Sequence, residues 1–206
     1  MRCFLLMLLL LTLPALAAPS VAYVVDIAKS AAWFEVSYWG GSTVKGKLSL
    51  LQGRVEFDEG AKNGRGEIGF DMNSVQTGRE FINDFVKSKQ IFDTATYPTM
   101  SFRPSRFEFV TERLLFVEGD LILHGVTRPV RLDVKRFTCQ ESMASLLFEI
   151  SQPALDDLPL NMGKNACYGE FSTSISRAQF GMDSLSLMVS DTVNISVNLV
   201  LQKAVP

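Results

Sequence analysis

Gly119–Val134, which reads GDLILHGVTRPVRLDV, is the stretch that decides the fold. Its apolar residues stand two positions apart in each half, at Leu121 and Leu123 and then at Val130, Leu132 and Val134. This period of two is typical of strands with one apolar face. Gly125 allows a tight reversal between the halves, and Pro129, near the start of the second strand, removes little from the hydrogen-bond ladder. The stretch predicts a β-hairpin with His124, the only histidine of the chain, beside its turn.

The same alternation recurs along the rest of the chain, at the short spacing of an antiparallel barrel or sandwich. After Pro104 the apolar positions shift by one, to Phe107 and Phe109, which predicts a bulge or bend at the proline. We expect an all-β fold of about eight to ten strands. The predicted strands are Trp33–Tyr38, Val44–Leu51, Arg54–Asp58, Gly66–Met72, Thr99–Arg103 and its continuation to Phe109, Leu114–His124, Arg128–Phe137, Ser145–Ile150, Phe171–Ile175 and Val193–Leu201.

Two of these strands indicate which side chains face the interior. The first carries its apolar residues at Leu115, Val117, Leu121 and Leu123, with Glu118, Asp120 and His124 on the opposite face. The second carries them at Val193, Ile195, Val197, Leu199 and Leu201. Because only one face of these strands is apolar, the other face meets water. A closed barrel of about eight such strands is just wide enough to hold one slender ligand.

One segment has the period of a helix instead. Phe81, Ile82, Phe85 and Val86 recur at the spacing of one helical face. Before them, Thr77 and Glu80 fit a capping box, in which a hydroxyl and a carboxylate satisfy free N–H groups. We therefore expect one short helix, about Gly78 to Lys89, that packs its phenylalanines against the sheet.

The first residues are typical of a secretory signal peptide. Arg2 precedes an apolar run of about a dozen residues, too short to span a membrane, and an A-x-A sequence follows at Ala15–Ala17. We expect residues 1–17 to be removed and residues 18–206 to form one exported domain. Cleavage after Ala18 is disfavoured because it leaves Pro19 first, and cleavage after Ala22 is an alternative. We also expect no membrane span, because no later segment is long and apolar enough.

The charge of the chain argues against nucleic acid as a partner. Its formal net charge is −2, and loss of Arg2, the one charged residue of the leader, makes it −3. No run of lysine or arginine offers a basic surface.

Removal of the leader also removes Cys3 and leaves Cys139 and Cys167. An even pair of cysteines in an oxidising compartment predicts a disulfide, with a reactive or metal-bound thiol pair as the alternative. Two cysteines and one distant histidine make a poor metal set, so we expect no metal.

His124 is the one candidate for a catalytic base. Asp120 on the same face is four residues back along the strand, about 13 Å away, and no serine or cysteine stands nearby in triad-like order. We therefore expect a histidine at the rim that bonds the turn backbone and points away from the interior. Asp26, Asp84 and Asp93 are best interpreted as cap or turn acceptors rather than an acidic site.

Five motifs together resemble the YceI-like polyisoprenoid-binding family of lipocalin-like periplasmic proteins. The resemblance runs in the family's order from about Tyr23 to Leu201. Each motif alone is weak, and the five in order are specific. They are Tyr23-x-x-Asp26-x-x-x-Ser30 followed by Phe34-x-Val36; Ser74-Val-x-Thr77-Gly78; Ser88-x-x-x-Phe92-Asp93-x-x-x-Tyr97-Pro98-x-x-x-Phe102; Gly119-Asp-Leu-x-Leu-x-Gly125-Val-Thr-x-Pro129-Val; and Arg177-x-x-Phe180-Gly-Met182.

This resemblance implies a lipocalin-like antiparallel barrel with a helix across one end and an elongated apolar cavity. It implies a periplasmic or secreted protein that carries a long isoprenoid chain, a quinone or a similar amphiphile, without catalysis or a further cofactor. Carried over by position, the cavity wall includes Phe34, Val36, Tyr38, Ile68, Phe70, Phe85, Phe92, Met100, Phe102, Leu121, Leu123, Phe171, Ile175, Phe180, Met182, Val193, Ile195 and Val197.

The chain departs from its relatives at three polar positions. Lys29, Tyr38 and Phe85 stand where many relatives carry histidines that are candidates for holding a ligand's head group. A wall with so few donors and acceptors selects a ligand by length and apolar area. A quinone head fits better than a pyrophosphate, because no cluster of lysine or arginine stands near the lost histidines.

Two other readings remain open at this stage. A stripe of phenylalanines is more often packed core than cavity, so the chain is alternatively a filled barrel that acts through its surface on a partner in the envelope. An enzyme that uses His124 or a thiol is the other alternative. An apolar cavity of several hundred Å³ would separate the carrier from the filled barrel.

Overall fold

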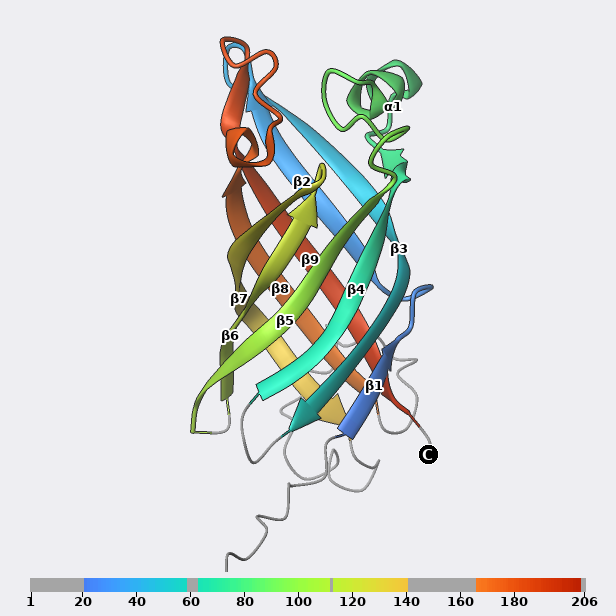
Figure 1. Cartoon of the computed structure of the whole chain (residues 1–206), viewed down its shortest axis with the longest axis vertical. Helices are drawn as coiled ribbons and strands as arrows, with labels where there is room; N and C mark the ends of the chain where they lie inside the picture. The colour runs from blue at the N-terminus through green and yellow to red at the C-terminus, as the bar shows by residue number, and fades with distance from the viewer. Residues whose placement is uncertain (1–20, 59–62, 112, 141–165, 205–206) are drawn as a thin grey trace, which may run out of the picture.

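A computed structural model describes residues 21–58, 63–111, 113–140 and 166–204. Its strands form one antiparallel sheet in the order β1-β3-β2-β9-β8-β7-β6-β5-β4, and pairing of β3 with β4 closes the sheet into a barrel (Figure 1). The predicted all-β antiparallel barrel is confirmed. The described elements are β1 (Val21–Val25), β2 (Ala31–Tyr38), β3 (Ser42–Asp58), β4 (Asn63–Gln76), α1 (Glu80–Lys87), β5 (Thr99–Val110), β6 (Arg113–Leu123), β7 (Val126–Gln140), β8 (Ala166–Ser176), the short 3₁₀ helix η2 (Arg177–Phe180) and β9 (Val189–Lys203).

β1 and β2 share one place in the barrel wall, so the nine described strands make a ring of eight. Both pair antiparallel with β3 and β9, β2 near the end that carries α1 and β1 near the opposite end (Figure 1). We call these the upper and lower ends. Where the two strands meet, the Ser30 hydroxyl accepts a hydrogen bond from Val200 N–H at 2.9 Å, and Asp26 N–H donates to Val200 O at 2.8 Å. These two bonds continue the ladder across the interruption.

β6 and β7 form the predicted hairpin. His124 and Gly125 make its turn with φ angles of 52° and 73°, a left-handed conformation that glycine adopts without strain. The position expected for Pro129 is wrong, since it is the fourth residue of β7 and lies opposite Asp120. β8 pairs with β7 only from Asp133 onward, so the proline stands where β7 has a single paired neighbour.

Two bulges between β5 and β6 decide which side chains face inward. The bulge predicted at Pro104 is confirmed by a register shift between Pro104 and Arg106. A second shift places Leu114 opposite Phe109. Leu114 is consequently buried, whereas Leu115, which the alternation predicted to face inward, is only half-buried. The prediction for Leu115 is wrong because a bulge reverses the parity of the residues beyond it.

Several strands are longer than their apolar patterns predict. The two strands expected at Val44–Leu51 and Arg54–Asp58 are a single strand, β3, of 17 residues. β4 extends beyond Gly66–Met72 at both ends. Backbone pairing with neighbours holds these extensions, and an alternation pattern does not register such pairing. The strand expected at Ser145–Ile150 lies outside the described residues, as do residues 1–17.

The one α-helix of the described residues, α1, covers part of the upper end and is shorter than expected (Figure 1). The predicted capping box is wrong: Arg79 occupies the N-cap without a side-chain hydrogen bond. The Thr77 hydroxyl instead donates to Asn83 Oδ1 at 2.8 Å, and Thr77 N–H donates to the same oxygen at 2.7 Å. The helix buries Val86, whereas Phe81 is 79% exposed, so the expected packing of its phenylalanines against the sheet is also wrong for Phe81.

The disulfide between Cys139 and Cys167 is present. The two residues are direct partners across β7 and β8, with Cα atoms 3.9 Å apart. The bond therefore ties two neighbouring strands of the wall at the lower end. Residues 141–165, between the two cysteines, lie outside the described ranges.

Ion pairs mark the outer face of the barrel. Lys45 pairs with Glu35 at 2.9 Å, Arg65 with Glu56 at 2.7 Å and Arg131 with Asp133 at 2.8 Å, and the basic side chain of each pair is largely exposed. Exposed pairs of this kind each contribute only about 0–1 kcal/mol. Their main consequence is a hydrated outer face, which leaves the apolar rows of the strands to face the interior.

Candidate ligand cavity

Two cavities occupy the interior of the barrel, one above the other. The lower cavity has a volume of about 450 Å³ and the upper one about 540 Å³. Both lie within the range of about 300–1,000 Å³ that is usual for small-molecule sites. Met100 and Ile195 line both cavities, so these two side chains stand between them. The interior is therefore hollow, and a completely filled barrel is excluded.

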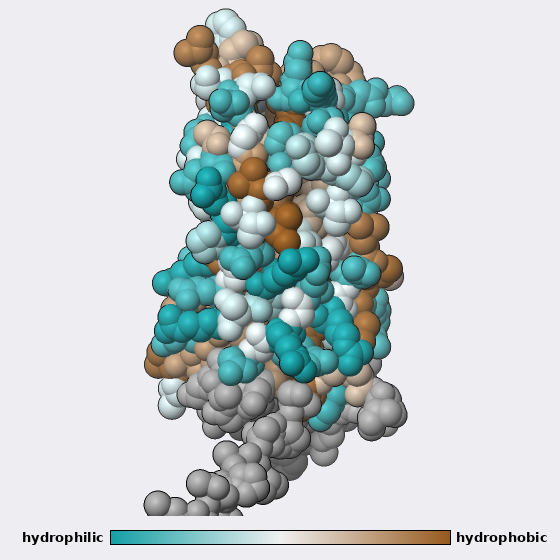
Figure 2. Space-filling model, viewed as in Figure 1, coloured by the Kyte–Doolittle hydropathy of each residue, from teal (hydrophilic) through white to brown (hydrophobic). Residues whose placement is uncertain are grey.

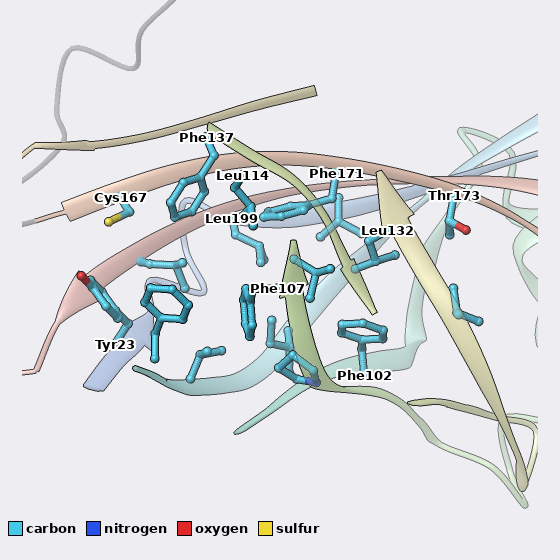
Figure 3. Close-up of a pocket in the computed structure, with 18 of the residues that line it drawn as sticks. Tyr23, Phe102, Phe107, Leu114, Leu132, Phe137, Cys167, Phe171, Thr173 and Leu199 are labelled. Carbon is cyan, nitrogen blue, oxygen red and sulfur yellow. The ribbon is translucent and has the colours of Figure 1, made fainter. Parts of the chain in front are cut away.

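Nearly all of the predicted wall residues line one cavity or the other, because they lie on the inward faces of the strands. Phe102 and Phe171, for example, lie across the lower cavity from one another (Figure 3). Predicted residues that line the lower cavity are Ile68, Phe70, Met100, Phe102, Leu121, Phe171, Ile195 and Val197. Those that line the upper cavity are Phe34, Val36, Tyr38, Phe85, Phe92, Leu123, Ile175, Met182 and Val193, with Met100 and Ile195.

Phe180 is the one predicted wall residue that lines neither cavity. It belongs to η2 and is only 1% exposed, so its ring is packed into the core. Its carbonyl oxygen accepts a hydrogen bond from His124 Nδ1–H at 3.1 Å. The family pattern does not indicate the 3₁₀ turn at this position. In such a turn the side chains do not alternate between two faces as they do along a strand.

Sequence reasoning also left out several wall residues. Leu199 and Leu201 continue the inward row of β9, and Val117 belongs to the row of β6, so their parity already identified them. Tyr23, Phe57 and Phe137 line the lower cavity as well, and no comparable alternation singled them out. Trp33 of β2 also lines the upper cavity, as do Arg79 and Leu185, which lie in loops whose meeting no local pattern predicts.

Glycines on the strands make room for the wall phenylalanines. A Cβ atom at Gly46 would strike the ring of Phe34, its cross-strand partner, and one at Gly169 would strike the ring of Phe171. The rings therefore lie in space that the missing side chains leave free. This placement keeps bulky aromatic groups at the wall and leaves the centre of the barrel open.

The lower cavity offers only weak polar groups. Tyr23, Thr111 and Thr173 are the residues with side-chain hydroxyls among its lining, and the Cys139–Cys167 disulfide is part of the wall. The lining contains no aspartate, glutamate, lysine, arginine or histidine. The cavity therefore favours an apolar chain over a charged ligand.

The upper cavity has two guanidinium groups in its wall, Arg79 and Arg177. Arg79 is exposed, whereas Arg177 is only 6% exposed. The Arg177 guanidinium donates to backbone carbonyl oxygens of Met182, Ser184 at 2.6 Å, Val189 at 3.1 Å and Ser190 at 3.0 Å. Those bonds occupy most of its N–H groups, so Arg177 holds the loop before β9 in place beside the cavity.

Asp191 supports the same corner. Its carboxylate accepts a hydrogen bond from Ala178 N–H at 2.9 Å. A hydrogen bond from Ser176, that bond from Ala178 and the charge of Arg177 hold the pKa of Asp191 below its ordinary value. The shift is thus explained by local structure at the base of the loop, outside both cavities.

Titratable groups with shifted pKa values lie away from the cavities. Burial, together with the hydrogen bond that its hydroxyl donates to Glu170 Oε1 at 2.7 Å, raises the pKa of Tyr168 to about 12. Tyr168 follows Cys167 on β8 and so faces the opposite side of the strand from the lower cavity. A catalytic acid or base is commonly a shifted group within a cleft. In the described ranges, the groups with shifted pKa values line neither cavity.

His124 does not line either cavity, as expected from its strand face. Its ring lies 4.4 Å from that of Tyr97, and its partner is the Phe180 carbonyl rather than the backbone of its own turn. Among the described residues, no group of three or more histidine, cysteine or acidic side chains is placed to hold a metal ion. No helix in the described part of the chain is long and apolar enough to cross a membrane.

A closed antiparallel barrel of eight positions, a helix over one end and an apolar interior together define a lipocalin-like barrel. The chain belongs to the family of YceI-like domains, whose pattern matches residues 23–201 and thus nearly all of the described sequence. The resemblance inferred from the five motifs is thereby confirmed.

Curated relatives share part of this sequence. A UPF0312 protein of Vibrio parahaemolyticus is 28% identical over 123 residues, which are 58% of this chain and 65% of that protein. A UPF0312 protein of Shewanella denitrificans is 31% identical over 113 residues, 53% of this chain and 59% of the relative. The matched region thus spans about three fifths of the length of these relatives.

Solved structures share the fold. BcnA of Burkholderia cenocepacia superimposes with a TM-score of 0.61 at 22% identity, over 85% of this chain and 98% of that one. A polyisoprenoid-binding domain of Saccharophagus degradans, described as implicated in plant cell wall breakdown, gives a TM-score of 0.59 at 20% identity. That match covers 89% of this chain and 99% of the domain.

Proposed function

We propose that this protein is an exported carrier that holds one long isoprenoid or quinone-like amphiphile inside its barrel and performs no catalysis. One observation carries the proposal: the inward row of β9 runs through both cavities. Val193 lines the upper cavity, Ile195 lines both, and Leu201 lines the lower one. Val193 and Leu201 are about 26 Å apart along the strand. The apolar space is therefore suited to a long, thin ligand.

The energetics favour a tail that crosses both cavities. Each CH₂ group that leaves water for an apolar wall contributes about 0.8 kcal/mol, so about ten buried carbons offset much of the cost of ordering a flexible ligand. Met100, which stands between the cavities, is an unbranched and adaptable side chain. A change of its rotamer would join the two spaces without moving the backbone.

The polar groups favour a small head at the upper end. Arg79 is the exposed guanidinium at that opening, and the donors of Arg177 are largely committed to backbone carbonyls. A quinone carbonyl needs only one or two donors, whereas a pyrophosphate calls for several cations that converge on it. The wall therefore supports a quinone-like or similarly uncharged head over a pyrophosphate.

Export is part of the proposal. The leader-like residues 1–17 predict passage across a membrane, to the periplasm or beyond the cell. The Cys139–Cys167 disulfide is in keeping with that expectation, because such bonds persist in oxidising compartments. The Saccharophagus degradans domain, which is described as binding polyisoprenoid, supports the class of ligand.

The test is to extract the purified, exported protein with organic solvent and identify the released molecules by mass spectrometry. We expect one long-chain amphiphile per protein molecule, and we expect stripped protein to take up a ubiquinone or polyprenol analogue. Protein that yields no lipid and takes up neither analogue would defeat the carrier proposal.

A further inference from the structure

Six exposed apolar side chains surround the opening of the upper cavity, and we call them the apolar rim. Tyr38 and Trp39 lie at the tip of the β2–β3 hairpin, Phe81 and Phe85 on α1, and Leu187 and Met188 in the loop before β9. All three segments lie at the upper end of the barrel (Figure 1), where Figure 2 shows brown and tan apolar residues among teal hydrophilic ones. The described residues include eleven large apolar side chains that are exposed, and six of these form the rim.

The apolar rim stands on ordered backbone. Leu187 is fully exposed at the apex of a turn in which Met188 N–H and Val189 N–H both donate to Leu185 O, at 2.8 and 2.9 Å. Trp39 N–H donates to Met188 O at 2.8 Å and so joins the hairpin tip to this loop. The same loop is held from beneath by Arg177. Specific hydrogen bonds thus hold the backbone that presents the exposed leucine and tryptophan side chains to water.

The rim is continuous with the lining of the upper cavity, where Arg79 is the one exposed charged residue. Tyr38, Phe81, Phe85 and Met188 are exposed at the surface and also line the upper cavity. Trp39 and Leu187 lie outside the lining and extend the apolar surface further into solvent, since they are 73% and 100% exposed. An apolar path therefore leads from the tips of the loops into the barrel.

We propose that the apolar rim docks into the surface of a lipid bilayer, with Trp39, Phe81 and Leu187 inserted into the interface and the cavity opening facing the lipid. Three separate tips from three segments suit a fluid layer, which adapts to an uneven surface, better than a second rigid copy of this chain. Tryptophan and phenylalanine favour the region between head groups and acyl chains.

The charges beside the rim indicate which lipid surface it fits. The helix segment carries Arg79 and Lys87 together with Glu80 and Asp84, and the loop carries Asp183. These residues form no basic cluster of the kind that recognises anionic lipid. The rim is therefore suited to a neutral, zwitterionic surface that it enters by apolar contact. Docking also gives the proposed cargo a route into the barrel that avoids water, and this consequence alone rests on the proposed carrier function.

Trp39 is a built-in reporter for the experiment. The chain has two tryptophans, and Trp33 lines the upper cavity, so the conservative variant Trp33→Phe leaves Trp39 as the single emitter. Neutral phosphatidylcholine vesicles should shift its emission to shorter wavelength, and brominated acyl chains should quench it. Vesicle flotation, carried out with the parent protein that retains both tryptophans, measures the bound fraction directly.

Matched variants separate docking from cargo binding. Trp39→Gln with Leu187→Gln removes two rim residues that line neither cavity, so vesicle binding should fall by about tenfold or more while extracted lipid content stays unchanged. The control pair Leu51→Gln and Val110→Gln removes two exposed apolar side chains outside the rim and should leave vesicle binding as it was.

Four results would overturn the docking proposal. The first is neither flotation with vesicles nor a shift of the Trp39 emission, and the second is an equal loss of vesicle binding in the rim pair and the control pair. The third is vesicle binding that requires anionic lipid and disappears with salt. The fourth is concentration-dependent self-association that the rim pair loses, without any vesicle binding. Protein that carries no lipid but still binds vesicles through the rim would instead support docking while it defeats the carrier proposal.

Discussion

The lower and upper cavities are both lined by the inward-facing residues of the barrel strands, but they differ in what encloses them. Strand residues make up nearly all of the lower wall, which includes a disulfide between β7 and β8. The upper cavity lies beneath α1 and the loop before β9, contains two arginines and opens among exposed aromatic side chains. Alternation in the strands thus creates the apolar space, whereas α1 and the loop before β9 shape the opening of the upper cavity. If the protein is a carrier as proposed, the lower half is the expected place for a tail and the upper half for its entry.

The largest expected effect on stability follows from a charge placed in the wall of the lower cavity. Val197→Asp buries a carboxylate with no partner, and it should destabilise the fold by about 4 kcal/mol or more, or prevent folding altogether. The matched control is Ser196→Asp, the preceding residue on the exposed face of β9, which should change stability by about 0.5 kcal/mol or less. Denaturant unfolding measures both, and similar effects of the two variants would mean that the facing of β9 is misassigned.

The next largest effect on stability is expected from loss of the Cys139–Cys167 disulfide in the wall of the lower cavity. Replacing Cys139 and Cys167 by serine removes a bond that spans 28 positions of sequence, so stability should fall by about 3–4 kcal/mol on the chain-entropy estimate. Hydrogen exchange should rise more at the lower ends of β7 and β8 than beside α1. Intact mass of the exported protein without reduction should show no alkylated cysteine, and two alkylated thiols would contradict the pairing.

Paired glycine variants shrink one cavity at a time. Gly46→Ala should displace the ring of Phe34 in the upper half, and Gly169→Ala that of Phe171 in the lower half. Overpacking of this kind costs about 1–3 kcal/mol. A long isoprenoid analogue should bind less tightly to both variants, whereas a short one held in the upper cavity should lose affinity only with Gly46→Ala. Fluorescent analogues of two lengths give the comparison, and equal responses of the two analogues would mean that the cavities are not separate sites for a tail.

A smaller effect is expected at His124, which lies in the turn between β6 and β7 and lines neither cavity. His124→Ala loses the contact with Phe180 O and the ring of Tyr97, at a cost of about 1 kcal/mol. His124→Asn is the better-matched change, because asparagine tolerates the left-handed backbone of this position. Ligand content after extraction should stay unchanged in both variants. Loss of ligand at unchanged thermal stability would show that this side chain contributes to binding.

The smallest effect is a pH dependence at the corner that Asp191 supports. The lowered pKa of Asp191 means that its carboxylate favours the folded state above about pH 4, and that this contribution is lost as pH falls through the lowered pKa. Acid should therefore loosen η2, whose Ala178 N–H donates to this carboxylate. NMR titration of the Asp191 carboxyl should give a value below its ordinary 3.8. In Asp191→Asn the acid-induced loosening should be absent, and an unchanged transition there would assign it to another group.

Much of the cavity wall was predictable because strand alternation is a local property. The rows of β6 and β9 assigned Leu121, Leu123 and Val197 to the interior without any knowledge of their partners. Prediction failed where that local rule was interrupted. A bulge opposite Phe109 exchanged Leu114 for Leu115, and the turn of η2 packed Phe180 away from the cavities. The capping box at Thr77 failed because Asn83 offered its hydroxyl a different partner.

The sequence by itself determined the antiparallel strands, the family and the apolar side of the wall, since these depend on side-chain order and on motifs read in sequence. Only the tertiary structure decided that β1 and β2 share one place in the ring, that Met100 and Ile195 divide the interior, and that three distant segments form one apolar rim. Each of those features depends on contacts between residues far apart in the chain. Barrel closure brings such residues together, and a local sequence pattern does not predict which of them will be in contact.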